Sequence, residues 1–190
     1  MTANKNFKRR VRARARRTGE SYTAALRHLR HEDAEERPMQ HTWRRVAKPE
    51  FGYALQIPDG WDERPPNLRN SPIETARFVD PTDRRHSVIV FRAMPQPGAT
   101  ALDAAERVRP VLAASGFDDF QITPAEVAGR PGARLDCAKH DAGRTWTVRE
   151  YFVVEGETPF ALGCGTFTPE ADDPLFTTLA THFELLPPPA

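Results

Sequence analysis

Between residues 50 and 186, hydrophobic and polar positions alternate along several short segments of the chain. In the segment 51–57 every second residue is aromatic or aliphatic, which is the pattern of a strand that packs on one face. Similar runs predict strands at residues 75–79, 87–94, 121–127, 133–139, 145–154 and 160–167. Turn-forming residues separate most of these runs at hairpin distance, so the pattern predicts an antiparallel sheet.

Two segments of the same region have the 3.6-residue period of an amphipathic helix. The first follows Thr100, a good N-cap residue, and contains Pro110, which is expected to kink the helix or end its regular part. Its expected apolar face consists of Leu102, Ala105, Val108 and Leu112. The second helix is expected to begin at Asp172 or Asp173, with Pro174 in its first turn. An antiparallel sheet flanked by helices with one apolar face each belongs to the α+β class, here as an α/β/α sandwich.

The start of the chain has a different pattern and predicts a basic helical arm over residues 1–31. Arginine alternates with alanine and valine as far as Gly19, where a helix is expected to stop, and Ser21 can cap a second short helix. Residues 32–49 lack periodicity and are interpreted as a linker between the arm and the sandwich. Trp43 within the linker is expected to pack against one of the two flanking units.

The net charge of +1 hides a strong asymmetry between the two parts of the chain. Residues 1–48 contain 14 Lys and Arg against 5 Asp and Glu, whereas residues 49–190 contain 13 against 21. The candidate nucleic-acid or anion-binding residues are Lys8, Arg9, Arg10, Arg12, Arg14, Arg16, Arg17, Arg27 and Arg30. On a helix the first seven would form a nearly continuous positive surface, and arginine suits bidentate contacts with phosphate. The alternatives for its target are nucleic acid or a ribonucleoprotein, an acidic protein or the acidic domain itself, and a membrane surface.

Residues 15–29 also resemble the helical part of ribbon-helix-helix antitoxins, through a Thr-Gly-Glu-Ser turn followed by an apolar-periodic helix. A ribbon-helix-helix protein also needs a base-reading strand before its first helix. Residues 4–7 are too short and alternate too poorly for such a strand.

No catalytic residue is predicted, although one group has a suitable composition for nucleophilic catalysis. Cys137 is followed by His140 and Asp141, and a cysteine nucleophile needs a base and a group that orients the base. Residues so close along a hairpin rarely adopt that geometry. His28 and His31 lie one helical turn apart, but we interpret them as solvated residues at a helix end. The sequence therefore predicts no enzyme activity, no metal ion and no cofactor.

The chain has no apolar run that could serve as a signal peptide or as a membrane span, which predicts a cytoplasmic protein. Its charged fraction of 28% and its hydrophobic fraction of 39% are typical of a soluble globular domain. A triple proline predicts that residues 187–190 form a Pro-rich tail beyond the last helix.

The order of the predicted elements resembles that of the PsbP-like, Mog-type and LpqN-like proteins. The likeness is carried by Phe51 to Trp61, Gly129 to Leu135, Glu150 to Val154, Phe160 to Leu162 and the closing Phe176-x-x-Leu179-x-x-x-Phe183. The resemblance implies a small α/β/α sandwich that binds other proteins or small ligands and is rarely catalytic. We therefore expect a non-enzymatic binding or accessory protein. A nucleic-acid-associated regulator, in which the arm carries the activity, is the alternative.

Overall fold

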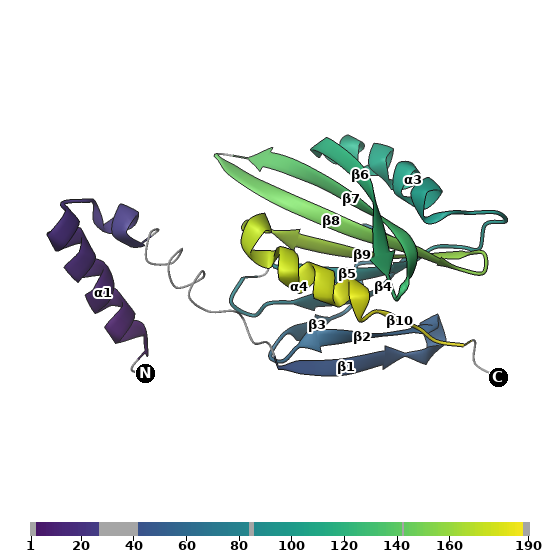
Figure 1. Ribbon diagram of the computed structural model, residues 1–190, viewed down its shortest axis with the longest axis horizontal. Coiled ribbons are helices and arrows are strands. Elements are labelled where there is room, and N and C mark those ends of the chain that lie inside the picture. The colour runs from purple at the N-terminus through teal and green to yellow at the C-terminus, as the bar shows by residue number, and fades with distance from the viewer. Residues whose placement is uncertain (1–2, 27–41, 84–85, 142, 188–190) are drawn as a thin grey trace. The chain divides into compact units, whose positions relative to one another are not determined.

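The computed structural model of the 190-residue chain describes residues 3–26, 42–83, 86–141 and 143–187. The chain forms two compact units, Met1–His41 and Thr42–Ala190 (Figure 1). Each unit contains its own cluster of buried apolar residues.

The N-terminal unit begins with the helix α1, Ala3–Thr18. It ends at Gly19, whose φ of +73° suits glycine and whose N–H donates to the carbonyl of Ala15 at 3.0 Å. A second helical segment follows, and the hydroxyl of its N-cap Ser21 accepts a hydrogen bond from the Ala24 N–H at 3.1 Å. Local chemistry thus explains both the end of α1 and the start of the next helical segment.

A small apolar cluster joins the two helical segments of this unit. Val11 and Ala25 are fully buried in it, and Ala15 and Leu26 pack around them. So few apolar atoms contribute only modest stability, since burial is worth roughly 25 cal/mol per Å². Residues 27–31 of the predicted arm lie outside the described residues.

The second unit contains two antiparallel sheets, of order β3-β4-β5-β9-β8-β7-β6 and β1-β2-β10. The strands are β1 (Trp43–Lys48), β2 (Tyr53–Pro58), β3 (Asp62–Arg64), β4 (Glu74–Val79), β5 (Ser87–Arg92), β6 (Asp118–Val127), β7 (Arg130–Asp141), β8 (Arg144–Glu155), β9 (Thr158–Thr166) and β10 (Glu184–Leu185). Helix α3 (Ala101–Ala114) follows β5, and α4 (Pro169–Thr181) follows β9. Strands β6 to β9 form the predicted meander of four consecutive strands.

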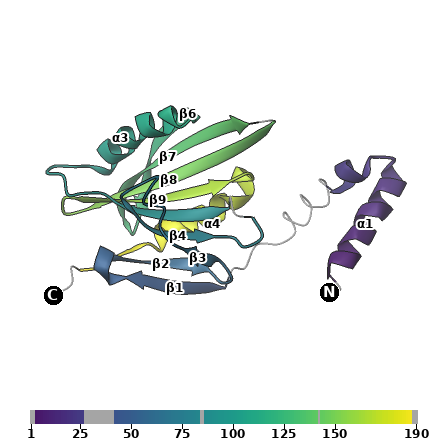
Figure 2. The same cartoon turned by 180° about the vertical axis from the view of Figure 1, so that it is seen from behind.

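Helix α3 covers one face of the seven-stranded sheet, and α4 together with the smaller sheet covers the other (Figures 1 and 2). Because successive side chains of a strand point to opposite faces, each central strand serves both layers. On β8, Val148 and Phe152 pack in the α3 layer, whereas Tyr151 and Val153 pack in the α4 layer. The predicted α+β class is therefore confirmed.

Strand β1 lies inside the range 32–49 that was predicted to be a linker, so that range is corrected. It pairs antiparallel with β2 along its whole length. Trp43 and Val46 pack against the core, whereas Arg45 lies at the surface and forms an ion pair with Glu184 of β10. Three of the six residues of β1 are basic, so its alternation does not show as a hydrophobic pattern.

Helix α3 differs in two respects from its prediction. It begins after the N-cap Thr100 as expected, but Leu102 is 55% exposed and does not belong to the apolar face. The other predicted residues, Ala105, Val108 and Leu112, do pack on the sheet, and Ala104 takes the place of Leu102 in the buried face. Pro110 lies inside the helix, which continues beyond it.

Two other boundaries also shift. Helix α4 begins at Pro169 after Thr168, so Pro174 lies in the helix interior and not in the first turn. Both prolines follow polar residues, and the sequence alone does not decide which of them occupies the favourable N-terminal position. Phe51 belongs to a short 3-10 turn, Pro49–Phe51, that precedes β2.

Candidate functional site

The cysteine, histidine and aspartate that were considered for catalysis do not form a catalytic group. Cys137 is 2% exposed in the α3 layer, and burial raises the pKa of its thiol to about 12. His140 lies near the exposed end of β7, with Nδ1 3.0 Å from the Thr145 hydroxyl and Nε2 3.2 Å from a carboxylate oxygen of Asp119. Neither contact involves Cys137, so these residues supply no base that would activate the thiol.

The structure describes five of the nine predicted anion-binding side chains. Four are exposed on α1: Lys8, Arg12, Arg16 and Arg17. The fifth, Arg14, is partly buried, and its Nε donates to Glu20 Oε1 at 2.8 Å. Arg9 and Arg10 lie in α1, where their side chains are not described. Arg27 and Arg30 lie outside the described residues.

Helix geometry explains why three of the four exposed basic residues share one side of α1. Residues four apart lie nearly above one another, about 6 Å apart along the axis, so Lys8, Arg12 and Arg16 form one row. Val11 and Ala15 lie in a different row, which packs on the following helical segment. The apolar row is therefore used for packing within the unit, while the basic side chains stay at the surface.

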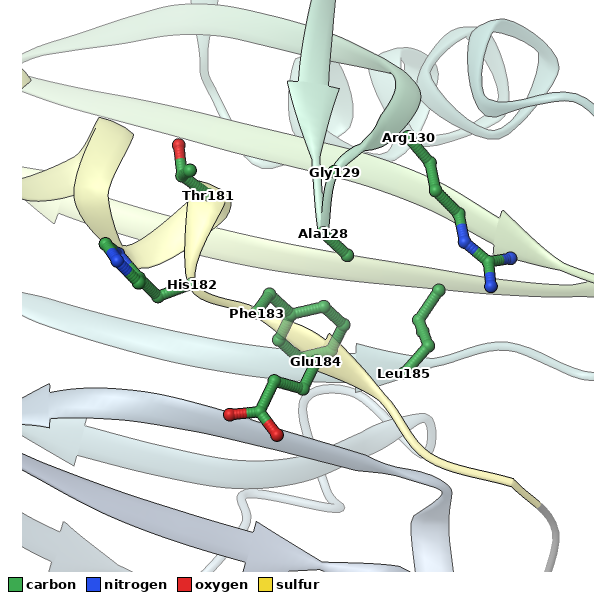
Figure 3. Close-up of a pocket in the computed structure, with 8 residues that line it drawn as sticks. All are labelled: Ala128, Gly129, Arg130, Thr181, His182, Phe183, Glu184 and Leu185. Carbon is green, nitrogen blue, oxygen red and sulfur yellow. The ribbon is translucent and has the colours of Figure 1, made fainter.

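An open pocket of about 530 Å³ lies between the β6–β7 hairpin and the segment that joins α4 to β10 (Figure 3). The N–H of Ala128 in the hairpin donates to the carbonyl of Ala180 at 3.0 Å, which fixes the hairpin to the end of α4. Phe183 is buried beside the pocket and stacks on Tyr53 with ring centroids 5.4 Å apart. The lining is mixed, with Ala128 and Leu185 beside the polar side chains of Arg130, Thr181 and Glu184, and such an open pocket can bind a small polar group or a peptide side chain.

Strand β10 lies at the edge of the smaller sheet and lines this pocket. Glu184 and Leu185 pair with Ala54 and Tyr53 of β2 on one side, and among the described residues no strand pairs with the other side. An unpaired strand edge is the place where a sheet can take up an extended peptide. Pocket and edge together therefore form a candidate recognition surface.

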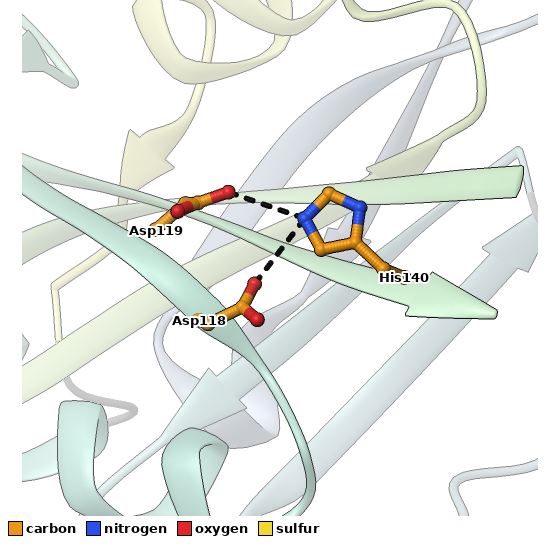
Figure 4. Close-up of side chains that lie close together, drawn as sticks. All are labelled: Asp118, Asp119 and His140. Atoms are coloured by element: carbon orange, nitrogen blue, oxygen red, sulfur yellow. Dashed lines mark hydrogen bonds and ion pairs between the residues drawn. The ribbon is translucent and has the colours of Figure 1, made fainter. Parts of the chain in front are cut away.

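Asp118, Asp119 and His140 form a second candidate site at one end of the β6–β7 pair (Figure 4). Nε2 of His140 is 3.4 Å from Oδ1 of Asp118 and 3.2 Å from Oδ2 of Asp119. The sequence offers little sign of this cluster, because Asp119 lies 21 residues from His140 and only strand pairing brings them together.

Glu150 is a buried carboxyl group in the middle of the larger sheet. It lies on β8 between Leu135 of β7 and Gly163 of β9, and it is 6% exposed. Burial raises its pKa to about 7. A Cβ at position 163 would meet Phe91 at 3.1 Å and Oε1 of Glu150 at 3.6 Å, so the glycine leaves room for both side chains.

The comparisons with known proteins concern the fold of the sandwich. No family model matches the chain, and no curated protein matches it significantly. The solved structure of the cyanobacterial PsbP protein (CyanoP) from Synechocystis sp. PCC 6803 is similar, with a TM-score of 0.60 and 17% identity over 76% of this chain and 93% of that one. A crystal structure from Bacteroides thetaiotaomicron VPI-5482 has a TM-score of 0.50 at 9% identity, over 76% of this chain and 48% of that one. The crystal structure of LpqN, involved in cell envelope biogenesis of Mycobacterium tuberculosis, has a TM-score of 0.48 at 15% identity, over 79% of this chain and 87% of that one.

The second unit therefore has a PsbP-like α+β fold, and this part of the predicted resemblance is confirmed. Similarity at 17% identity defines the fold and not the activity, because one fold hosts many functions. The likeness to Mog-type proteins stays a prediction. Within the described ranges, no helix has the length and apolar character needed to cross a membrane.

Proposed function

We propose that the protein is a non-enzymatic accessory protein of the cytoplasm, whose sandwich binds a protein or small ligand and whose basic helix contacts an anionic surface. The observation that carries the proposal is the row of exposed basic residues on α1, formed by Lys8, Arg12 and Arg16. The apolar side of α1 is already packed, so the basic side is the one available to a partner. A compact row of positive charges attracts polyanions and releases their counterions on binding.

The sandwich contributes the second recognition surface in this proposal. Its pocket lies beside the edge strand β10, so an extended segment of a partner could pair with the strand and insert a side chain into the pocket. The excess of acidic residues in this part of the chain supports a division of roles between the two units. The PsbP-like fold is compatible with an accessory role.

Elution of the full-length chain from immobilised heparin tests the role of α1. The triple variant Arg12→Gln, Arg16→Gln and Arg17→Gln should elute at clearly lower salt, since it removes three exposed charges from one helix. A matched triple variant of exposed sandwich residues, Arg69→Gln, Arg107→Gln and Arg109→Gln, should elute like the wild type. If the two triple variants lower the salt concentration of elution equally, α1 has no special role in binding heparin.

A nucleic-acid-associated regulator is the second candidate function, and the dominance of arginine over lysine on α1 favours it. Binding of the full chain to duplex DNA across a salt titration measures the number of phosphate contacts. If α1 makes them, the α1 triple variant should reduce the log–log slope by up to about 2.7, or about 0.9 per lost contact. Replacing the same residues with lysine should preserve the slope and lower the affinity, because lysine keeps the charge without the planar fork. Failure of the wild type to bind DNA at low salt would reject this candidate while leaving the heparin result to decide the first.

A further inference from the structure

The first two residues of β6 place both of their carboxylates beside His140. Successive side chains of a regular strand point to opposite faces, so neighbouring aspartates would normally separate. Here the pairing of β6 with β7 is interrupted between Asp118 and Gln121, and Asp119 has a φ of +53°. This irregularity turns both carboxylates toward the imidazole on β7 (Figure 4).

The distances from the imidazole nitrogen to the two carboxylates are close to donor–donor distances in the coordination sphere of a small divalent ion. Zinc binds imidazole nitrogen and carboxylate oxygen at roughly 2.0–2.2 Å, so neighbouring donors of a tetrahedral site lie about 3.3–3.5 Å apart. The observed separations from His140 Nε2 are 3.4 Å to Asp118 and 3.2 Å to Asp119. All three donor atoms lie within 4.8 Å of one another.

A residue outside this set orients the imidazole. Nδ1 of His140 is 3.0 Å from the hydroxyl of Thr145, its cross-strand partner on β8. In the metal-free protein Nε2–H faces the carboxylates; with a metal ion in place of that proton, Nδ1–H would donate to the Thr145 hydroxyl and keep Nε2 directed at the ion. Metal-ligating histidines almost always have such an outer partner for the second ring nitrogen.

Within the described residues, no lysine or arginine neutralises the negative charge of this cluster. In the described part of the chain, the ion pairs of Asp118 and Asp119 are those with His140. The adjacent Lys139 is directed elsewhere, because its Nζ donates to the Ser115 carbonyl at 2.8 Å and lies over the Phe117 ring. Two carboxylates against a single imidazole leave a site suited to a cation.

We propose that Asp118, Asp119 and His140 bind a divalent first-row transition-metal ion, with zinc as the reference ion. One imidazole and two carboxylates form a ligand set that suits such ions, and three protein ligands leave at least one coordination position open. The ligands are exposed, so the open position is accessible to water or to a donor group of another molecule. All three ligands of the site belong to the sandwich.

Zinc binding to the full-length chain, measured against a chromophoric chelator, tests the proposal. The background variant His28→Gln, His31→Gln removes the histidine pair of the arm, and we expect it to bind one equivalent. In this background His140→Gln or Asp119→Asn should weaken binding by at least about tenfold, and Thr145→Val should weaken it to a smaller extent. Cobalt added in place of zinc should produce visible absorption bands that are absent from the His140→Gln variant.

The control is His182→Gln, which removes an exposed histidine at the end of α4. It should bind zinc like the background, and circular dichroism should show that all variants are folded. If His140→Gln and His182→Gln bind equally well, or if the background binds no zinc, the proposal is wrong and the three residues form an ordinary surface ion pair. Either outcome leaves the heparin test of α1 unaffected.

Discussion

At the scale of single residues, Glu150 shows how an ionisable group is accommodated inside the sheet. Burial raises its pKa from the ordinary value of 4.5 to about 7, so the folded protein keeps this proton over a range in which the unfolded chain loses it. The unfolded state therefore binds fewer protons between about pH 4.5 and pH 7. Glu150 destabilises the fold progressively as the pH rises through this window, and the effect is complete above pH 7.

We expect Glu150→Gln to remove this pH dependence, because an amide has the shape of the protonated carboxyl and cannot ionise. The stabilisation of the variant relative to wild type should be about 2–3 kcal/mol larger at pH 8 than at pH 5. Urea unfolding at the two pH values measures the difference. Glu126→Gln, at an exposed position of β6, is the control. It should change the free energy of unfolding by the same amount at pH 5 and at pH 8. A gain for Glu150→Gln that does not change with pH would contradict the prediction.

At the scale of elements, the β6–β7 hairpin turns through two residues, Ala128 and Gly129, with φ values of +56° and +68°. Positive φ at both central residues is typical of a type I′ turn, whose twist matches that of the flanking strands. Because the next strand was predicted only from residue 133, the sequence indicated a longer connection that includes Gly132, but that glycine lies inside β7. A Cβ there would overlap the carbonyl oxygen of Phe152 and approach a Val127 methyl at 2.9 Å.

Gly132→Ala should therefore lower the free energy of unfolding by at least about 2 kcal/mol, because backbone of β8 has to shift. Gly156→Ala is the matched control: its φ is +59°, and no atom lies within 4 Å of the added methyl. Left-handed backbone alone should cost about 1 kcal/mol at that position. Urea unfolding compares the two variants, and a smaller loss for Gly132→Ala than for Gly156→Ala would show that the sheet absorbs the methyl easily.

The elements that could be predicted from the sequence are those whose own pattern defines them. Strands β6 to β9 are long, alternate clearly and are joined by short turns, so their order and pairing follow from local information. Strands β1 and β10 could not be found in this way, because one is rich in basic residues and the other has two residues. The Asp118–Asp119–His140 cluster depends on pairing between distant residues and on an irregular strand, neither of which has a periodic signal.

At the scale of the whole molecule, each unit contains the residues of its own apolar clusters. We therefore expect residues 42–190 alone to unfold cooperatively, with a free energy of unfolding within about 0.5 kcal/mol of the full chain. Urea unfolding followed by tryptophan fluorescence measures both proteins. In the full chain, Val11→Asp should reduce helical circular dichroism without moving the transition of the sandwich. A clear loss of stability in the shortened protein would mean that the first 41 residues support the sandwich.

The pairing of β10 with β2 has a consequence for how the protein is made. Strand β2 and the core residues around Leu55 emerge from the ribosome early, whereas their partners on α4 and β10 are synthesised last. Until residue 185 has emerged, the nascent sandwich has to expose apolar surface that a chaperone can recognise. Helix α1 and its capping turn are complete long before that point, so the N-terminal unit can fold while the sandwich is still incomplete.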